Sequence, residues 1–254
     1  MYFTYNNVKI YYEVYGNSKN TILILPGWGN TRNTFLNIIN LLKDTYKIYI
    51  IDYPSFGNSP TPIHELTIYD YTELIYNFIK SNHINNPIII SHSFGGRISS
   101  ILISKYKLKV NKLILIDVAG IKRINIKLFI KTRIYKLLKK LTYLLPNKIQ
   151  INIRNKLLNR FSSNDYKDIP NIMKKTFQNI IKEDLKDYYK KIDTETLIIW
   201  GDKDIDTPLK DGKYLNKVIN NSGLIIYKNA NHFSYLNYPY LTNRILRDYL
   251  KQKK

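Results

Sequence analysis

The chain has 254 residues, 44 % of them hydrophobic and 23 % charged, which predicts one domain with a sizeable core and argues against disorder and bilayer-spanning segments. The absence of cysteine excludes disulfides, thiolate nucleophiles and iron–sulfur clusters, and with only four histidines we expect no metal or other cofactor. A net charge of +21 would suit nucleic acid or an anionic membrane, but Lys, Ile, Asn and Tyr crowd the whole sequence and no nucleic-acid-binding module appears, so we expect no nucleic-acid partner.

The first half of the chain alternates strand and helix patterns. Residues 1–15 alternate polar and apolar positions and break at Asn6 and Asn7, which predicts a β-hairpin. Short apolar runs bounded by Gly, Pro or Asn predict strands, and apolar residues three and four apart predict helices. The expected elements are strands at 21–25, 47–51, 87–91 and 112–116, and helices at 34–43, 66–81 and 94–106.

The alternation pauses after residue 119. Residues 120–191 show helical patterns without a convincing strand, and the alternation resumes with strands at 196–200 and 223–227 and helices at 209–219 and about 240–251. This order predicts an α/β fold with a mostly parallel central sheet, helices on both faces and the hairpin at one edge. We therefore expect a core of residues 1–119 and 192–254, interrupted by a helical lid at 120–191.

The candidate nucleophile is Ser93, which follows a buried strand and precedes two glycines and a helix. A nucleophilic serine at a strand-to-helix turn holds strained backbone angles, so the residues two before and two after it must be small. Ser91 and Gly95 meet that requirement. The alternative is an ordinary serine at a helix N-terminus, which the glycine pair after a buried strand disfavours.

A serine hydroxyl needs a base, and the base needs an acid to orient it. His232 lies in a loop after the last predicted strand, and Asp204 lies in the loop after the strand before it. Both loops follow the carboxyl ends of strands, where parallel sheets place their sites, and the order Ser, Asp, His is the one expected for this arrangement. Alternation along the loop leaves Asp202 and Asp206 open as the acid, and Asp117 also closes a strand.

An acyl-transfer site also needs donors for a developing oxyanion. The turn after residue 25 should lie beside Ser93, and we expect the backbone N–H groups of Trp28 and Phe94 to form the oxyanion hole. Gly27 and Trp28 are also candidate substrate-binding residues. Arg97 could favour an acidic substrate, although an exposed helix arginine is the simpler interpretation. No P-loop or Gly-x-Gly-x-x-Gly motif is present, so nothing supports nucleotide binding.

Together these motifs resemble the α/β-hydrolase fold family in its serine-nucleophile branch, over nearly the whole chain. Leu-Pro-Gly-Trp-Gly at 25–29 is similar to the family's oxyanion loop, and Ser-His-Ser-Phe-Gly-Gly at 91–96 to its Gly-His-Ser-x-Gly-Gly elbow. Residues 52–59 are similar to its Asp-x-Pro-Gly-x-Gly-x-Ser loop, and residues 200–208 and 231–232 to its acid and base loops. The resemblance implies Asp204 as the acid. Ser91 replaces the family's usual glycine, which we expect to be tolerated with some strain.

The lid carries much of the positive charge. Residues 118–164 contain twelve Lys or Arg and no Asp or Glu. At helical spacing, residues 126–145 separate an apolar face from a basic face, which predicts either a lid helix packed over the site or a surface that weakly attracts anionic lipid. The lid as a whole looks like that of poorly characterised bacterial hydrolases.

The leading hypothesis is a serine hydrolase that cleaves an ester, thioester or similar small carbonyl substrate through an acyl-enzyme. The alternatives are a carbon–carbon bond hydrolase or lyase with the same triad, and a catalytically silent binding protein on the same fold. The N-terminus shows no secretory signal, so we expect a cytoplasmic protein.

Overall fold

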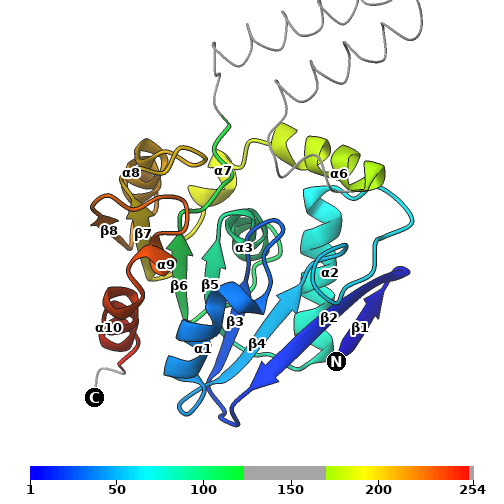
Figure 1. The fold of residues 1–254 in the computed structure, drawn as a ribbon, viewed down its shortest axis with the longest axis horizontal. Coiled ribbons are helices and arrows are strands. Elements are labelled where there is room, and N and C mark those ends of the chain that lie inside the picture. Colours follow the sequence, from blue (N-terminus) through cyan, green and yellow to red (C-terminus); the bar gives the residue numbers. More distant parts are fainter. Residues whose placement is uncertain (123–169, 252–254) are drawn as a thin grey trace, which may run out of the picture.

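The computed structural model describes residues 1–122 and 170–251, and an eight-stranded sheet lies at its centre (Figure 1). The strands are β1 (Tyr2–Tyr5), β2 (Val8–Tyr15), β3 (Thr21–Leu25), β4 (Lys47–Asp52), β5 (Ile88–His92), β6 (Lys112–Ile116), β7 (Thr196–Gly201) and β8 (Ser222–Tyr227). Their order across the sheet is β1-β2-β4-β3-β5-β6-β7-β8, with antiparallel pairing at β1–β2 and β2–β4 and parallel pairing elsewhere. The predicted fold, a mostly parallel sheet with an antiparallel hairpin at one edge, is confirmed.

The five central strands, β3 to β7, are mostly apolar because the sheet is buried on both faces there. The outer strands β1, β2 and β8 are partly exposed. In β5, Ile89 packs into one core while Ile88 and Ile90 pack into the other, since successive side chains of a strand point to opposite faces. The first core is covered by α2 (Ile68–Ser81), α3 (Phe94–Ser104) and α8 (Leu209–Val218), and the second by α1 (Leu36–Leu42) and α10 (Pro239–Leu250).

Two short elements differ from the expected pattern. The helix predicted at 34–43 is divided into a 3₁₀ turn, η1 (Arg32–Phe35), and α1. A four-residue helix, α9 (Ser234–Asn237), begins two residues after His232 and was not expected, because a single turn is too short to show helical spacing. The other helices and strands begin and end within two residues of their predicted bounds.

Two helices of the expected lid are described, α6 (Asn171–Lys182) and α7 (Lys186–Tyr189). Figure 1 shows both beyond the end of the sheet toward which β5 and β6 point. The amphipathic helix expected at 126–145 lies outside the described residues, so the basic face stays a prediction. Among the described helices, none is both long and apolar enough to cross a bilayer.

Candidate active site

Ser93 stands at the turn between β5 and α3, with φ 46° and ψ −110°. Positive φ is costly for a residue with a side chain, so packing must enforce it. Gly95 shows how tight the turn is, because a Cβ at that position would lie 2.0 Å from the carbonyl oxygen of Leu25 on β3. The elbow therefore holds the serine above the sheet, where β3 and β5 end side by side.

The structure brings the three candidate triad side chains together. The Nε2 atom of His232 lies 2.8 Å from the hydroxyl oxygen of Ser93, and its Nδ1 atom lies 2.8 Å from Oδ2 of Asp204. An ionised carboxylate only accepts hydrogen bonds, so Nδ1 carries the ring proton and Nε2 is free to accept the serine proton. This is the tautomer that a general base needs.

Asp204 is the carboxylate that contacts the histidine, so the geometry favours it over its neighbours in the loop. Its Oδ1 accepts from the backbone N–H groups of Asp206 (2.8 Å) and Thr207 (2.9 Å), and its Oδ2 lies 2.6 Å from the Thr207 hydroxyl. Burial opposes its charge, but the hydrogen bonds from His232 and Thr207 outweigh burial and hold the pKa of Asp204 below its usual value. The acid is thus ionised and fixed in orientation.

Thr207 is a site residue that the sequence analysis missed. Its hydroxyl lies 3.2 Å from Nδ1 of His232 as well as near Asp204. A carboxylate that accepts from backbone N–H groups two and three residues later forms an Asx-type turn, for which the spacing of Asp204 and Thr207 is a recognisable signal.

Asp117, the remaining alternative acid, has a different role. Its side chain is buried, with Oδ1 accepting from the N–H of Gly201 (2.8 Å) and Oδ2 from the N–H of Ser234 (3.1 Å). Burial raises its pKa to about 7, against the opposing effect of these donors. Asp117 thus joins the end of β7 to the loop that carries His232, and it makes no hydrogen bond to the imidazole in the described structure.

His92, at the end of β5, also contacts the base loop and was not singled out by the sequence analysis. Its Nε2 lies 2.8 Å from the backbone oxygen of His232, and because a carbonyl only accepts, Nε2 must donate. The ring is fully buried, and burial lowers the pKa of His92 to about 3, so it stays neutral. Its other nitrogen faces Gly27, where an added Cβ would lie 2.7 Å from Nδ1.

The candidate oxyanion donors lie on the neighbouring turn and on the first residue of α3. The rings of Trp28 and Phe94 pack edge to face with centroids 5.4 Å apart. Among the described residues, neither backbone N–H donates to another backbone group, since the turn closes through Asn30 N–H to Gly27 O and the helix through Gly96 N–H to Ser93 O. Their role as oxyanion donors stays a prediction.

Arg97 is not the exposed helix arginine that the simpler interpretation expected. It is only 8 % exposed, and its Nη1 donates to the backbone oxygens of Ile180 (3.1 Å) and Glu183 (3.3 Å) at the end of α6. A residue one turn into the helix after the nucleophile is covered here by the end of α6, which hydropathy along the sequence could not reveal. Contact with a substrate is untested.

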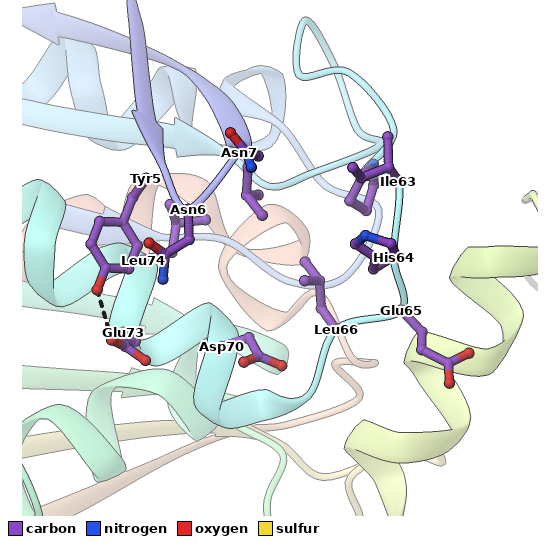
Figure 2. Close-up of a pocket in the computed structure, with 12 residues that line it drawn as sticks. Tyr5, Asn6, Asn7, Ile63, His64, Glu65, Leu66, Asp70, Glu73 and Leu74 are labelled. Atoms are coloured by element: carbon purple, nitrogen blue, oxygen red, sulfur yellow. Dashed lines mark hydrogen bonds between the residues drawn. The ribbon is translucent and has the colours of Figure 1, made fainter.

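Two other features were considered as sites. Figure 2 shows a pocket of about 250 Å³ between the β1–β2 turn and α2, lined by acidic residues that already have partners, since Glu73 accepts from Tyr5 and Asp70 caps α2. No triad residue lines it. Ligand atoms of Asp204, Asp206 and His232 lie within 4.8 Å of one another, but His232 and Thr207 already occupy the Asp204 carboxylate.

The chain is similar to known proteins over nearly its whole length. A family model described as alpha/beta hydrolase fold matches residues 20–239. The chain is 26 % identical over 266 residues to an uncharacterized hydrolase, YugF, of Bacillus subtilis, covering 98 % of this chain and 97 % of the relative. It is 26 % identical over 263 residues to a pimeloyl-[acyl-carrier protein] methyl ester esterase of Wigglesworthia glossinidia brevipalpis, covering 95 % and 98 %. The solved structure of MGS-M2, an enzyme from a deep-sea metagenome library, has a TM-score of 0.77 at 21 % identity, covering 100 % of this chain and 98 % of its own.

Proposed function

This chain belongs to the α/β-hydrolase fold family, and from that premise we propose that it is a serine hydrolase that cleaves an ester, thioester or similar small carbonyl substrate through an acyl-enzyme. The observation that carries the proposal is the continuous hydrogen-bonded path from Ser93 through His232 to Asp204, with both distances 2.8 Å. The methyl ester esterase among its relatives supports the choice of ester substrates. In this proposal residues 1–119 and 192–254 form the catalytic core, and residues 120–191 form its lid.

In the first step, the hydroxyl oxygen of Ser93 forms a bond to the substrate carbonyl carbon while Nε2 of His232 takes the hydroxyl proton. The carbonyl electron pair moves onto its oxygen, which becomes an oxyanion. The imidazolium that results is stabilised by the Asp204 carboxylate 2.8 Å from Nδ1. Asp204 keeps its charge throughout, in agreement with its lowered pKa.

The oxyanion accepts hydrogen bonds from the backbone N–H groups of Trp28 and Phe94. Phe94 is the first residue of α3, so its N–H points out of the positive end of the helix dipole. Donors that are fixed before the reaction need no reorganisation, and each typically contributes ~10²–10³ in rate.

Collapse of the tetrahedral intermediate breaks the bond to the leaving group, which takes the proton from His232 and departs as an alcohol or thiol. His232, neutral again, then removes a proton from a water molecule that attacks the acyl carbon. The second tetrahedral intermediate collapses by breaking the bond to Ser93, whose oxygen recovers the proton. The balance is one ester or thioester and one water consumed, and one carboxylic acid and one alcohol or thiol released.

A fluorophosphonate probe tests this proposal, because it reacts covalently only with an activated serine. We expect labelling of the wild type, and its loss in Ser93→Ala and His232→Ala. Ser99→Ala is the matched control, since it removes a buried hydroxyl that donates to Gly96 O in the same helix. Labelling that persists in Ser93→Ala would refute the site, and an unlabelled wild type would favour the silent binding protein.

A panel of p-nitrophenyl esters of rising acyl length, with a matching thioester, then defines the substrate class. Ser93→Ala should lower kcat by roughly 10⁶-fold, the loss typical of removing a triad nucleophile. A protein that is labelled at Ser93 but inactive on every ester and thioester would favour the carbon–carbon bond hydrolase, whose triad is the same. An assay on a substrate with a cleavable bond beside a ketone would separate the two.

A further inference from the structure

Helix α6 is attached to the core at several points. On its buried side lie Met173, Thr176 and Ile180, all within 1 % of complete burial. The Thr176 hydroxyl accepts from the backbone N–H of Leu66, 3.0 Å away, at the residue before the α2 cap. Just beyond the helix, Glu183 accepts from the hydroxyl of Tyr69 on α2 at 3.2 Å. These contacts fix the helix against α2.

Arg97 holds the C-terminal end of the same helix. Its guanidinium reaches the carbonyl oxygens of Ile180 and Glu183 from α3, four residues after Ser93. The last carbonyls of a helix carry partial negative charge, so a cation there complements the helix dipole. Ile180 O also accepts the backbone N–H of Glu183 at 3.3 Å, and Arg97 adds a second, charged donor. Burial of Arg97 removes competition from water and lowers the pKa of its guanidinium, and the nearby acidic residues Asp184 and Glu183 offset part of the cost of burying its charge.

The same helix reaches the oxyanion turn. The ring of Phe177 lies 5.3 Å from the indole of Trp28, centroid to centroid. Phe56 (5.0 Å), Phe94 (5.4 Å) and Tyr71 (6.3 Å) surround the indole from other directions. Phe177 is the member of this cluster that comes from the lid, so the placement of α6 determines whether the indole is covered.

We propose that α6 is a fixed wall of the substrate site, in which Arg97 is a positioning residue and Phe177 limits the size of the group bound beside Trp28. This inference rests on the proposed function for the identity of the site. The substrates it favours carry a compact acyl group, because a long flexible chain beside the oxyanion turn would have to displace a helix that three core contacts hold in place.

Tryptophan fluorescence tests the wall without requiring activity. The chain has two tryptophans, and Trp200 is fully buried with its indole N–H bonded to Thr207 O, so quenching by acrylamide reports mainly on half-buried Trp28. We expect Arg97→Met, which keeps the apolar stem but loses the donors, to red-shift the emission and raise the quenching constant. Arg97→Lys, which keeps a cationic donor, should recover part of the change.

Ile181→Ala is the matched control, because Ile181 is on the same helix but 47 % exposed. It should leave both fluorescence readings unchanged. Thermal unfolding of each variant shows whether the protein is folded at the temperature of measurement. A folded Arg97→Met protein whose emission and quenching equal those of the wild type would overturn the role of Arg97.

The acyl-length panel tests the limit on size. We expect Phe177→Ala to move the optimum of kcat/KM to longer acyl chains, mainly through a lower KM for those esters, while fluorophosphonate labelling of Ser93 persists. Ile181→Ala should keep the wild-type optimum. An unchanged acyl-length optimum in a labelled Phe177→Ala protein would overturn the size limit. Failure to label the wild type would instead overturn the proposed function, and the fluorescence result would then decide the placement of α6.

Discussion

His232 experiences two opposing influences on its charge. Burial disfavours the imidazolium, but the carboxylate of Asp204 stabilises it more, and the net effect raises the pKa of His232 above its usual value. The base works only when neutral, so kcat/KM should rise with pH as the ring loses its proton. We expect the acid limb of the profile to have its midpoint above the ordinary histidine value of about 6.5. A midpoint at or below that value would contradict the paired geometry.

Asp204→Asn separates the orienting role of the acid from its charge. Without the carboxylate, burial is the main remaining influence on the ring, so the acid limb should move to lower pH. The amide also favours the wrong tautomer, and comparable changes in serine proteases lower kcat about 10⁴-fold. Asp206→Asn is the control for charge alone, because the exposed Asp206 carboxylate also raises the pKa of His232, but only the Asp206 backbone N–H bonds to Asp204. An equal loss in both variants would point to a general effect of charge.

The buried hydroxyl of Ser91 lowers the free energy of unfolding. Ser91 is fully buried on β5, and its hydroxyl has no hydrogen-bond partner in the described structure. Its φ is not positive, so the side chain itself causes no backbone strain at this position. An unsatisfied buried hydroxyl costs about 1–3 kcal/mol, so Ser91→Ala should raise the free energy of unfolding by roughly 1 kcal/mol. Chemical denaturation measures this, and a destabilised variant would imply a partner for the hydroxyl.

At the scale of elements, the loop between β8 and α9 must hold His232 still, and two buried side chains from neighbouring strands anchor it. Asp117 at the end of β6 accepts from Ser234 N–H, and His92 at the end of β5 donates to His232 O. The base loop is thus anchored by β5, the strand that leads to the nucleophile, and by β6 beside it.

His92→Phe should therefore weaken the base without affecting substrate contacts. The phenyl ring keeps most of the packing against Phe233 and Tyr235 but leaves the His232 carbonyl unpaired. A lost buried hydrogen bond of about 1.4 kcal/mol corresponds to roughly a tenfold change, so we expect kcat to fall by about that factor while KM stays nearly constant. His92→Gln, whose amide can donate near the position of Nε2, should recover part of the loss. Equal kcat in the wild type and in a folded His92→Phe protein would show that the bond does not position the base.

The central strands were predictable because each is buried on both faces and bounded by turn residues, and the edge hairpin because its polar and apolar positions alternate. Chain order and strand ends place Ser93, Asp204 and His232 at one edge of the sheet. The choice among Asp117, Asp204 and the neighbouring aspartates was not predictable from spacing alone. This choice depends on which carboxylate lies close to Nδ1 of His232 and which carboxylate accepts from backbone N–H groups instead. Those distances arise from tertiary packing.

The prediction that Arg97 is exposed was wrong for a related reason. Its position in the sequence, on a helix with serine and isoleucine neighbours, is compatible with solvent, substrate or lid. Its burial depends on α6, which is more than seventy residues away in the chain. Local sequence patterns indicate which face of a helix is apolar or polar, but they do not identify which distant segment, here α6, packs on that face.

At the scale of the whole molecule, the positive charge is unevenly placed along the chain. Residues 118–164 carry twelve Lys or Arg without an acidic residue, more than half of the net excess of +21. A uniform compositional bias would spread the surplus of Lys and Arg over the whole chain. A surplus concentrated in one segment is therefore the part of the charge for which we expect a function. Juxtaposed basic residues attract anionic lipid surfaces by about 1 kcal/mol each near the surface.

Sedimentation with phosphatidylserine vesicles at low salt tests whether the lid provides that attraction. We expect binding that disappears near ~0.5 M salt, because the screening length there is only a few ångströms. Lys139→Glu/Lys140→Glu should lose most of the binding. Lys210→Glu/Lys213→Glu, an equal change of charge at two exposed positions of α8, should retain it. Equal losses of binding in the two double variants would assign the binding to net charge. No sedimentation of the wild type at low salt would show that the basic residues of the lid serve only as its solvated surface.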